Sequence, residues 1–423
     1  MLLVFVHVRS QAVSAQCKAR FVAQSVSFGQ FLAFGGAPAA LAARPARDAR
    51  IDVIRGLALL FIFINHMPGN VIAGFMPHNF GFSDAADAFV LLAGVSATLA
   101  YGGLIDRDGV LAGARKVGRR VWTLYVAHAA VFLLVCAIVA TAVVQTKNPL
   151  YLEAINIHSL FSQPAQAIFD ALTLRYQPYY LDILPLYIVL LGLFPAIYVG
   201  MRFSPLLTLA ASFALWFCAG TFGLNLPNAG SGGWFFNPFA WQFIFVLGIL
   251  IGRAAQLGLS APRLRLVDAA ALAFLLFALA IKTSSGNPFG IVALNDWIDQ
   301  VQLGTDKTNL AFARIAHVLA LAWLAIRYLP AGGALLASGA GRLLAHAGRH
   351  SLEVFCVGIV LSIAGQIVMA ETGFALGVQL LISLFGAMVL LGLGAFLSWF
   401  KASDKTGSAS SGLQASGLSP QRS

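Results

Sequence analysis

The sequence has very little charge for its length. Only 10% of its 423 residues are charged, whereas 59% are hydrophobic. A water-soluble protein of this size needs more charged residues than this to cover its surface. The composition therefore excludes a soluble globular domain.

Cysteine and acidic residues are scarce as well. The chain has four cysteines and neither a CxxC nor a CxxH pair, so we expect no disulfide framework and no metal site. There are 16 Asp and Glu residues against 27 Lys and Arg. The basic residues lie in short loops between apolar segments, where they set membrane topology. We therefore do not expect nucleic acid as a partner.

The short alternating apolar and polar segments of a membrane β-barrel are also absent. The chain instead contains apolar runs of about 20 residues, the length of helix that crosses a hydrocarbon core of roughly 30 Å. We expect an all-α polytopic membrane protein, a bundle of about ten transmembrane helices surrounded by membrane lipid. The expected spans are 52–70, 84–104, 119–144, 179–200, 205–222, 236–256, 264–283, 309–329, 350–370 and 375–399.

The composition changes near both ends of the chain. Residues 1–47 are irregular, and we expect them to be a disordered leader or an over-long start. Residues 48–400 form the expected membrane domain. Residues 401–423 are rich in Ser, Gly and Gln, which is typical of a disordered tail.

Lys and Arg are distributed unevenly between the two sides of the predicted membrane. When the N-terminal segment is assigned to the cytoplasm, 22 of the 27 fall on the cytoplasmic side. This excess predicts a multi-pass inner-membrane protein with both termini in the cytoplasm. The loops on the other side are long and rich in Gly, Asn, Pro and aromatic residues, which favours substrate handling there. These outer loops are 71–83, 145–178, 223–235 and 284–308.

The first expected span contains two ionisable residues, Arg55 and His66. Ionisable side chains inside a membrane are costly and usually functional. Eleven residues of helix place Arg55 and His66 on nearly the same face, about 16.5 Å apart along the axis. Arg55 alone is well explained as an anchor at the inner boundary. For His66, which follows Asn65, we favour a catalytic role.

The second expected span begins with a polar segment. Ser83 is the expected N-cap, and Asp84 and Asp87 then lie in the first turn, where the helix dipole favours carboxylates. The two aspartates also enter the membrane on the side to which His66 points. A carboxylate there would orient the imidazole and stabilise its protonated form, so Asp84 and Asp87 are further candidate catalytic residues.

Several other expected helices carry polar residues at the same membrane face. Aromatic-belt anchoring explains the neighbouring Trp and Tyr residues, but not charged and amide side chains. We expect a substrate-binding site there. Its candidate residues are Asp182, Asn237, Gln242, Asp306, Lys307, Arg314 and His317.

The spacing from Arg55 to His66 resembles the Arg-x10-His motif of acyltransferase family 3, the multi-spanning membrane acyltransferases. The segment from Asp87 to Gly94 resembles the second-helix signature of that superfamily, although Ala93 replaces the usual serine. In the first helix of relatives, we expect Asp before the histidine, whereas this chain has Asn65. His66 would therefore be oriented either by the Asn65 amide or by Asp84.

The closer resemblance is to the OpgC family, which adds succinyl groups to osmoregulated periplasmic glucans. It covers about residues 48–400. It rests on the segments Asp52-Val-Ile-Arg55-Gly56-Leu, Asn79-Phe-Gly-Phe-Ser83-Asp84-Ala-Ala, Leu184-Pro-Leu-Tyr187, Phe236-Asn237-Pro-Phe-Ala-Trp241-Gln242, Asp306-Lys307-Thr-Asn309-Leu and Gly348-Arg349-His-Ser-Leu-Glu-Val-Phe355.

The resemblance implies an acyltransferase with a cytoplasmic acyl-CoA donor, most simply succinyl-CoA, a periplasmic glycan acceptor and no permanently bound cofactor. His66 would act as general base or carry the acyl group itself, and both routes stay open. Lys307 or Arg314 would bind an acyl carboxylate or the acceptor. A homo-oligomer or a complex with glucan-synthesis proteins also stays open. The nucleotide phosphates would be held by Arg55, Arg115, Lys116, Arg119, Arg120 and Arg349.

The rival hypothesis is a transporter or flippase that moves an envelope lipid or glycan precursor without chemistry. Transporters also place charges near the membrane midplane, often within repeated halves and broken helices. The sequence shows no convincing internal repeat and no matched Pro or Gly breaks. A purely structural membrane subunit is weaker still, because it gives no reason for His66, Asp182 and His317.

Overall fold

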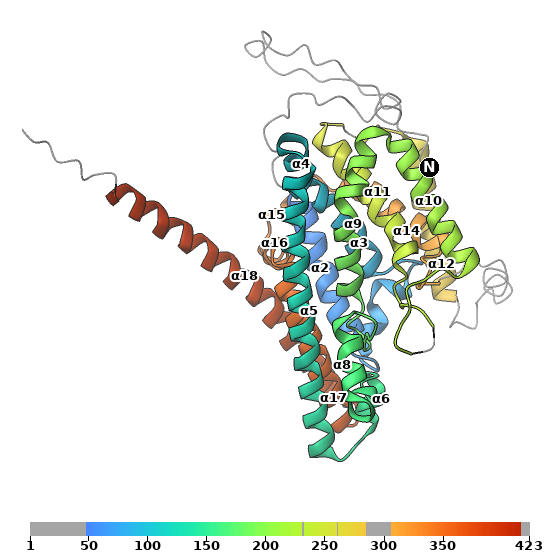
Figure 1. Cartoon of the computed structure of the whole chain (residues 1–423), viewed down its shortest axis with the longest axis vertical. Helices are drawn as coiled ribbons and strands as arrows, with labels where there is room; N and C mark the ends of the chain where they lie inside the picture. Colours follow the sequence, from blue (N-terminus) through green and yellow to red (C-terminus); the bar gives the residue numbers. More distant parts are fainter. Residues whose placement is uncertain (1–47, 231, 260, 285–305, 416–423) are drawn as a thin grey trace, which may run out of the picture. The chain divides into compact units, whose positions relative to one another are not determined.

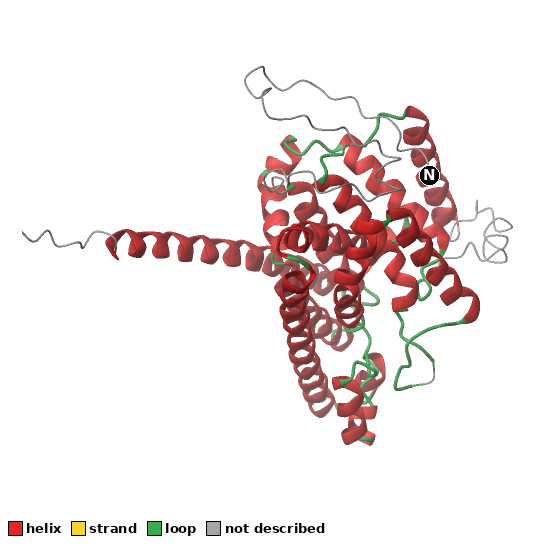
Figure 2. Ribbon diagram, turned by 45° about the horizontal axis from the view of Figure 1, so that its top comes forward, coloured by secondary structure: helices red, strands yellow, loops and turns green. Residues whose placement is uncertain are grey.

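The structure is a computed structural model that describes residues 48–230, 232–259, 261–284 and 306–415. The described residues are helices and loops with no strand, apart from one isolated bridge between Pro227 and Gly233 (Figure 2). Eight of the described helices are long and apolar enough to cross a membrane. The chain is therefore an all-α polytopic membrane protein, as its composition predicts. The expected leader 1–47 and most of the expected outer loop 284–308 lie outside the described residues.

The chain divides into two compact units. Within the described residues, unit 1 comprises 74–230, 232–259, 261–284 and 306–330, and unit 2 comprises 48–73 and 331–415. The expected membrane domain 48–400 is thus shared between them, and each unit is described by itself.

Unit 1 contains six of the eight long apolar helices. A seventh helix, α14, matches the expected span 309–329 but has only 17 residues. Figure 1 labels the principal helices of the unit. They are α3 (Ala85–Ala97), which continues through the π-helical turn η4 (Thr98–Gly102) into α4 (Gly103–Asp108), α5 (Val110–Thr146), α9 (Ile183–Phe203), α10 (Pro205–Phe222), α11 (Pro238–Gln256), α12 (Arg265–Ser284) and α14 (Phe312–Tyr328).

Helices α3 and α11 form the centre of unit 1, because glycines let their backbones approach. A Cβ at Gly94 would overlap the Phe245 carbonyl oxygen, and one at Gly248 would overlap the Leu91 carbonyl oxygen. A small residue at such a contact permits close packing of membrane helices without a clash. In the apolar 18-residue stretch of α11, 78% is buried inside the protein, more than in any other candidate membrane span among the described residues. This rigid pair carries the polar cluster described below.

The far ends of these two helices are joined by a buried polar group that the sequence did not reveal. Arg253 donates to Asp106 Oδ2 at 2.5 Å and to the Tyr198 hydroxyl at 2.6 Å. The Tyr198 hydroxyl also donates to Asp106 Oδ2 at 2.8 Å. Gln256 Nε2 donates at 2.8 Å to the carbonyl oxygen of Thr98, the first residue of the π-helical turn. Three residues far apart in sequence thus pair their charges and share hydrogen bonds, which offsets part of the cost of burying charge.

Unit 2 is built around α2 (Ala49–Asn65), which packs on α16 (Gly339–Arg349), α17 (Ser351–Glu371) and α18 (Leu376–Ala415). A Cβ at Gly56 would overlap the Leu344 carbonyl oxygen of α16, and one at Gly348 would overlap the Asp52 carbonyl oxygen. The expected tenth span runs on as α18 to Ala415. The expectation that the chain becomes disordered from residue 401 is therefore wrong as far as Ala415.

Relative helix directions within unit 2 agree with the alternating topology that the sequence predicts. In unit 2, Ser362 of α17 donates to the Phe63 carbonyl oxygen, and Gly365 lies against Met67, so α17 runs parallel to α2. Asn70 donates to Ser383, and Gly386 faces Phe63, so α18 runs antiparallel to α2. The first, ninth and tenth expected spans, which correspond to α2, α17 and α18, have these directions.

The expected outer loops contain short helices rather than open chain. Loop 71–83 contains the 3-10 turns η2 (Val71–Phe75) and η3 (Pro77–Asn79). Loop 145–178 contains α6 (Leu150–Ala154), α7 (Ser159–Ser162) and α8 (Pro164–Leu172). The Ala229 amide donates to the Arg175 carbonyl oxygen at 2.8 Å, which ties loop 223–235 to loop 145–178 within unit 1.

Candidate functional site

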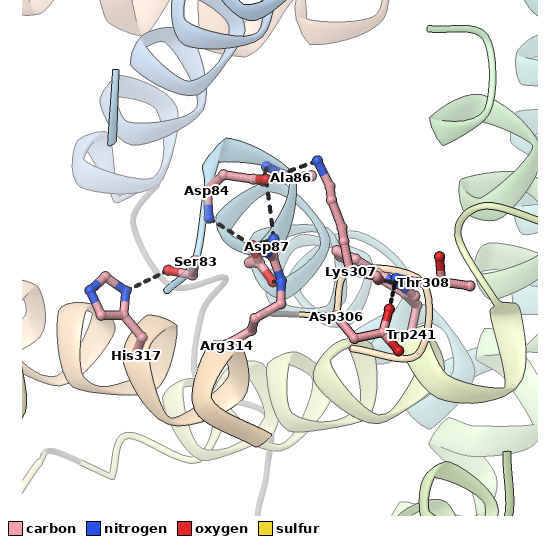
Figure 3. A network of polar contacts seen from close by, with 10 residues as sticks. All are labelled: Ser83, Asp84, Ala86, Asp87, Trp241, Asp306, Lys307, Thr308, Arg314 and His317. Carbon is pink, nitrogen blue, oxygen red and sulfur yellow. Dashed lines mark hydrogen bonds and ion pairs between the residues drawn. The ribbon is translucent and has the colours of Figure 1, made fainter. Parts of the chain in front are cut away.

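Unit 1 holds four of the predicted site residues in one ion-pair cluster (Figure 3). Arg314 Nη2 lies 2.5 Å from Asp87 Oδ2 and 3.1 Å from Asp84 Oδ2, and its Nε lies 3.2 Å from Asp87 Oδ1. Lys307 Nζ lies 2.8 Å from Asp84 Oδ2. Asp87 is fully buried, so its charge requires the bidentate contact with Arg314. The structure brings these four predicted site residues together, and their predicted roles toward substrate stay predictions.

The start of α3 explains the arrangement of the two aspartates, and it corrects the expected N-cap. Asp84, not Ser83, is the N-cap, and its Oδ1 accepts from the Ala86 amide at 2.8 Å. Asp87 Oδ2 accepts from the Asp84 amide at 2.8 Å, which completes a capping box. The two carboxylates thereby satisfy backbone donors of the first turn and still face the cations.

Ser83 instead contacts His317, whose ring lies one turn along α14 from Arg314. Ser83 Oγ lies 2.7 Å from His317 Nδ1, and both side chains are buried (Figure 3). A Cβ at Gly81 would overlap His317 Nε2, so only glycine leaves room for this ring position. The rings of Phe82 and Phe274 lie 6.1 Å and 6.4 Å from the imidazole ring. This environment has one polar partner and apolar walls, so His317 joins helices α3 and α14.

The segment that carries Lys307 is held against α10 and α11 by tryptophan side chains. Trp241 Nε1 donates to the Lys307 carbonyl oxygen at 2.9 Å, and Trp216 Nε1 donates to the Leu310 carbonyl oxygen at 3.0 Å. The Asn237 side chain donates at 2.9 Å to Asn309 Oδ1. These contacts fix the backbone of the segment, so Lys307 is presented from a defined position. Sequence reasoning assigned Trp241 to the aromatic belt and missed this role.

Two carboxyl groups at the edge of the cluster have shifted pKa values. Burial by itself would raise the pKa of Asp84, but the charges of Lys307 and Arg314 more than offset it and hold the pKa well below its usual range. Asp182 precedes α9, and its burial raises its pKa to about 6, against an opposing effect of the Lys307 charge. Lys307 therefore acts electrostatically on both Asp84 and Asp182. Its side chain is 31% exposed, whereas that of Arg314 is 7% exposed, so Lys307 is the accessible cation of the pair.

The remaining predicted substrate residues differ in what they contact. Asp306 is exposed, and its Oδ1 accepts from the Thr308 amide at 2.9 Å. Asn237 is fully buried and is the N-cap of α11. Gln242 is buried against α10, where its side chain bonds Ser212. The side chains of Asn237 and Gln242 thus satisfy protein groups, which explains them structurally without a substrate.

His66 belongs to unit 2 and is the C-cap of α2. The helix ends at Asn65, earlier than the expected span 52–70. Its amide donates to the Ile62 carbonyl oxygen at 3.1 Å, and its side chain is half-buried. Arg55 lies on the same helix, eleven residues earlier, as predicted. The roles of Asp84 and Asp87 toward His66 stay predictions, because these residues belong to unit 1.

The six basic residues predicted to hold phosphates are divided between the units. Arg349 of unit 2 lies 3.3 Å from Asp52 of the same unit and is 40% exposed. Arg55 of that unit is half-buried. The other four lie on the first turns of α5 in unit 1, where three are exposed and one is half-buried; they are Arg115, Lys116, Arg119 and Arg120.

Residues 47–402 match the family described as OpgC protein. The chain belongs to the OpgC protein family. No curated protein and no solved structure matches it. The match extends over both units, so the polar cluster of unit 1 and His66 of unit 2 are both parts of the OpgC region. Membership assigns the chain, at a coarse level, to membrane transferases involved in glucan succinylation. The wider likeness to acyltransferase family 3 stays a prediction.

The OpgC region contains no candidate metal centre in the part that the structure describes. No group of three or more His, Cys, Asp or Glu side chains lies close enough there to hold an ion. Cys136, Cys218 and Cys356 form no disulfide within the described residues.

Proposed function

We propose that this OpgC protein transfers a succinyl group from cytoplasmic succinyl-CoA to a hydroxyl group of a periplasmic glucan. The observation that carries the proposal is the family match over residues 47–402, which includes every residue to which we assign a role. The protein would be a multi-pass protein of the inner membrane with cytoplasmic termini, as the distribution of Lys and Arg predicts.

His66 is the proposed general base. It takes the proton from the acceptor hydroxyl while the hydroxyl oxygen attacks the thioester carbon; the carbon–sulfur bond breaks, and coenzyme A leaves as its thiol after protonation. The positive charge that forms on His66 lies at the C-terminal carbonyl groups of α2, which stabilise it. An acyl-histidine route would use the same side chain and the same helix end.

The donor is proposed to enter from the opposite end of α2. Arg55 lies about 16.5 Å from His66 along the helix axis, a distance that an extended pantetheine arm can bridge. Arg349 is paired with Asp52, but its exposed side chain retains donors for a phosphate. Arg55 and Arg349 are therefore the proposed phosphate contacts of unit 2.

The cluster of unit 1 is proposed to contact glucan hydroxyl groups through Lys307 and Asp306 at its exposed edge. In the part of unit 1 that the structure describes, the carboxyl groups of Asp84, Asp87 and Asp182 interact with the two cations Lys307 and Arg314. An added acyl carboxylate would increase this excess of negative charge. Neutral sugar hydroxyl groups, which donate to carboxylates, are better suited to it.

Mass spectrometry of envelope glucans tests the proposal. The comparison includes wild type, a deletion strain, and the deletion complemented with wild-type protein, with His66→Ala or with His158→Ala. His158 is an exposed histidine of an outer loop and provides the matched control. We expect the succinyl mass increment to be absent in the deletion and with His66→Ala, and present with wild type and His158→Ala. Identical glucans in the wild-type and deletion strains would contradict the proposed function.

A further inference from the structure

Two buried amide oxygens in unit 2 have no hydrogen-bond partner among the described residues. They are Asn65 Oδ1, on the last residue of α2, and Gln366 Oε1, on α17. Buried polar atoms are nearly always paired, and each exception requires an explanation. A recurrent explanation is a catalytic or binding site, where a ligand supplies the missing partner.

Helix geometry places Gln366 at the level of His66. Ser362 Oγ of α17 donates to the Phe63 carbonyl oxygen at 3.0 Å, and Gly365 lies against Met67. The two helices run in parallel, and Gln366 lies one turn beyond Ser362 on the same face. At 1.5 Å per residue, Gln366 is about 6 Å beyond Phe63 and His66 about 4.5 Å beyond it. Asn65, Gln366 and His66 therefore lie at nearly the same level along α2, near its C-terminal end.

Two other amide side chains of unit 2, those of Asn70 and Gln379, make hydrogen bonds to protein groups and so differ from Asn65 and Gln366. Asn70 donates to Ser383 Oγ at 2.8 Å. The Gln379 side chain accepts from the Val71 amide at 2.7 Å and donates to the Phe374 carbonyl oxygen at 2.6 Å. These two amide side chains are thus hydrogen-bonded to protein groups, which gives them a structural role.

The Ile62, Phe63 and Ile64 carbonyl oxygens at the end of α2 accept hydrogen bonds from protein groups. The Asn65 and Gln366 oxygens are also acceptors, so their ligand must donate. An ionised carboxylate or phosphate has no hydrogen to donate to them. A group that presents adjacent hydrogen-bond donors and carries no negative charge fits instead.

We propose that Asn65 and Gln366 hold the acceptor sugar by accepting hydrogen bonds from hydroxyl groups adjacent to the one that His66 deprotonates. This inference rests on the proposed function and specifies it, since it assigns the sugar's immediate contacts to unit 2. Asn65 and Gln366 are binding and positioning residues. A sugar ring carries neighbouring hydroxyl groups that donate to two acceptors while a third reaches the base.

Steady-state kinetics of the purified full-length protein in nanodiscs test this inference. The probes are succinyl-CoA as donor and unmodified glucan extracted from a deletion strain as acceptor. The variants Asn65→Leu and Gln366→Met keep side-chain size and lack the acceptor oxygen, whereas Asn65→Asp keeps one. Ser362→Ala is the matched control, because Ser362 shares the helix face with Gln366 but bonds only the Phe63 and Gly358 carbonyl oxygens.

We expect KM for the glucan to rise about tenfold in Asn65→Leu and in Gln366→Met, with KM for succinyl-CoA unchanged. Asn65→Asp should stay near the wild-type KM for the glucan, and Ser362→Ala should change neither KM. The melting temperature of substrate-free Asn65→Leu should equal or exceed that of wild type, because the substitution removes a buried acceptor without a partner. A purely structural role for Asn65 would lower it.

Two results would overturn the inference. An increased KM for succinyl-CoA instead of glucan would assign the oxygens to the amide N–H groups of the donor arm. Unchanged KM values in both Asn65→Leu and Gln366→Met would remove the two residues from the site. If Asn65→Leu does not fold, Gln366→Met compared with Ser362→Ala still tests the inference. Absence of transfer by the wild-type protein would instead refute the proposed function itself.

Discussion

Ser83 Oγ of the segment before α3 lies 2.7 Å from His317 Nδ1 of α14, and both side chains are buried. This contact takes Ser83 away from the helix N-terminus, so Asp84 caps α3 in its place. The cap, the ion pairs and the imidazole contact consequently belong to one connected group. Its members support one another, and their removal should have graded consequences.

Removal of Ser83 should cost much less stability than removal of Asp84. Ser83→Ala leaves the capping box intact and loses one buried hydrogen bond, which costs about 1 to 3 kcal/mol. Asp84→Ala loses the cap and a carboxylate that faces Lys307 and Arg314, which should cost about 3 to 5 kcal/mol. Thermal unfolding of the two variants in detergent compares them. Equal losses would contradict Asp84 as the N-cap.

The pair of Asp87 and Arg314 should show strong coupling in a double-mutant cycle. Arg314→Gln leaves the fully buried Asp87 carboxylate without its bidentate partner, at a cost of about 3 to 5 kcal/mol. Asp87→Asn combined with Arg314→Gln should recover part of this loss, because no uncompensated charge then stays buried. The free energies of unfolding of both single variants and the double variant give the coupling. Purely additive losses would show that the two residues act independently.

Gly56 should tolerate no side chain, because α2 and α16 approach through it. A Cβ there would overlap the Leu344 carbonyl oxygen, a backbone atom that cannot rotate away. We expect Gly56→Ala to lower stability by about 1 to 3 kcal/mol or more. Gly392→Ala in α18 is the control, because a Cβ at Gly392 meets nothing within 4 Å. Similar melting temperatures for the two variants would contradict the close packing of α2 and α16.

Asp182 should make stability depend on pH near neutrality. Burial raises its pKa to about 6 in the folded protein, whereas an unfolded aspartate has a pKa of about 3.9. A raised folded pKa contributes stability below pH of about 4 that is lost as the pH rises through about 6. Asp182→Asn cannot ionise, so wild type should lose about 1 to 2 kcal/mol relative to this variant between pH 4 and pH 8. Melting curves that shift in parallel across this range would contradict the prediction.

The charges of the sequence predict part of the candidate site. Asp84, Asp87, Arg314 and Lys307 are recognisable because ionisable residues at the ends of apolar runs need a reason to be there. Their pairing could not be predicted, since it depends on which helices pack together. The group of Asp106, Tyr198 and Arg253 was missed for the same reason: each residue has an ordinary explanation at a helix end, and only their contact shows that they form a unit.

The sequence by itself determined that the chain is a helical membrane protein and where its apolar helices lie, because hydrocarbon requires long apolar helices whose backbone groups bond within the segment. Only the tertiary structure decided that Asp84 rather than Ser83 caps α3, that Arg314 forms ion pairs with two carboxylates, and that His66 lies at a helix end. The first two features depend on contacts between residues up to 234 positions apart. Local spacing specifies one helix face at a time, whereas the partner of a buried polar group is set by how the helices pack.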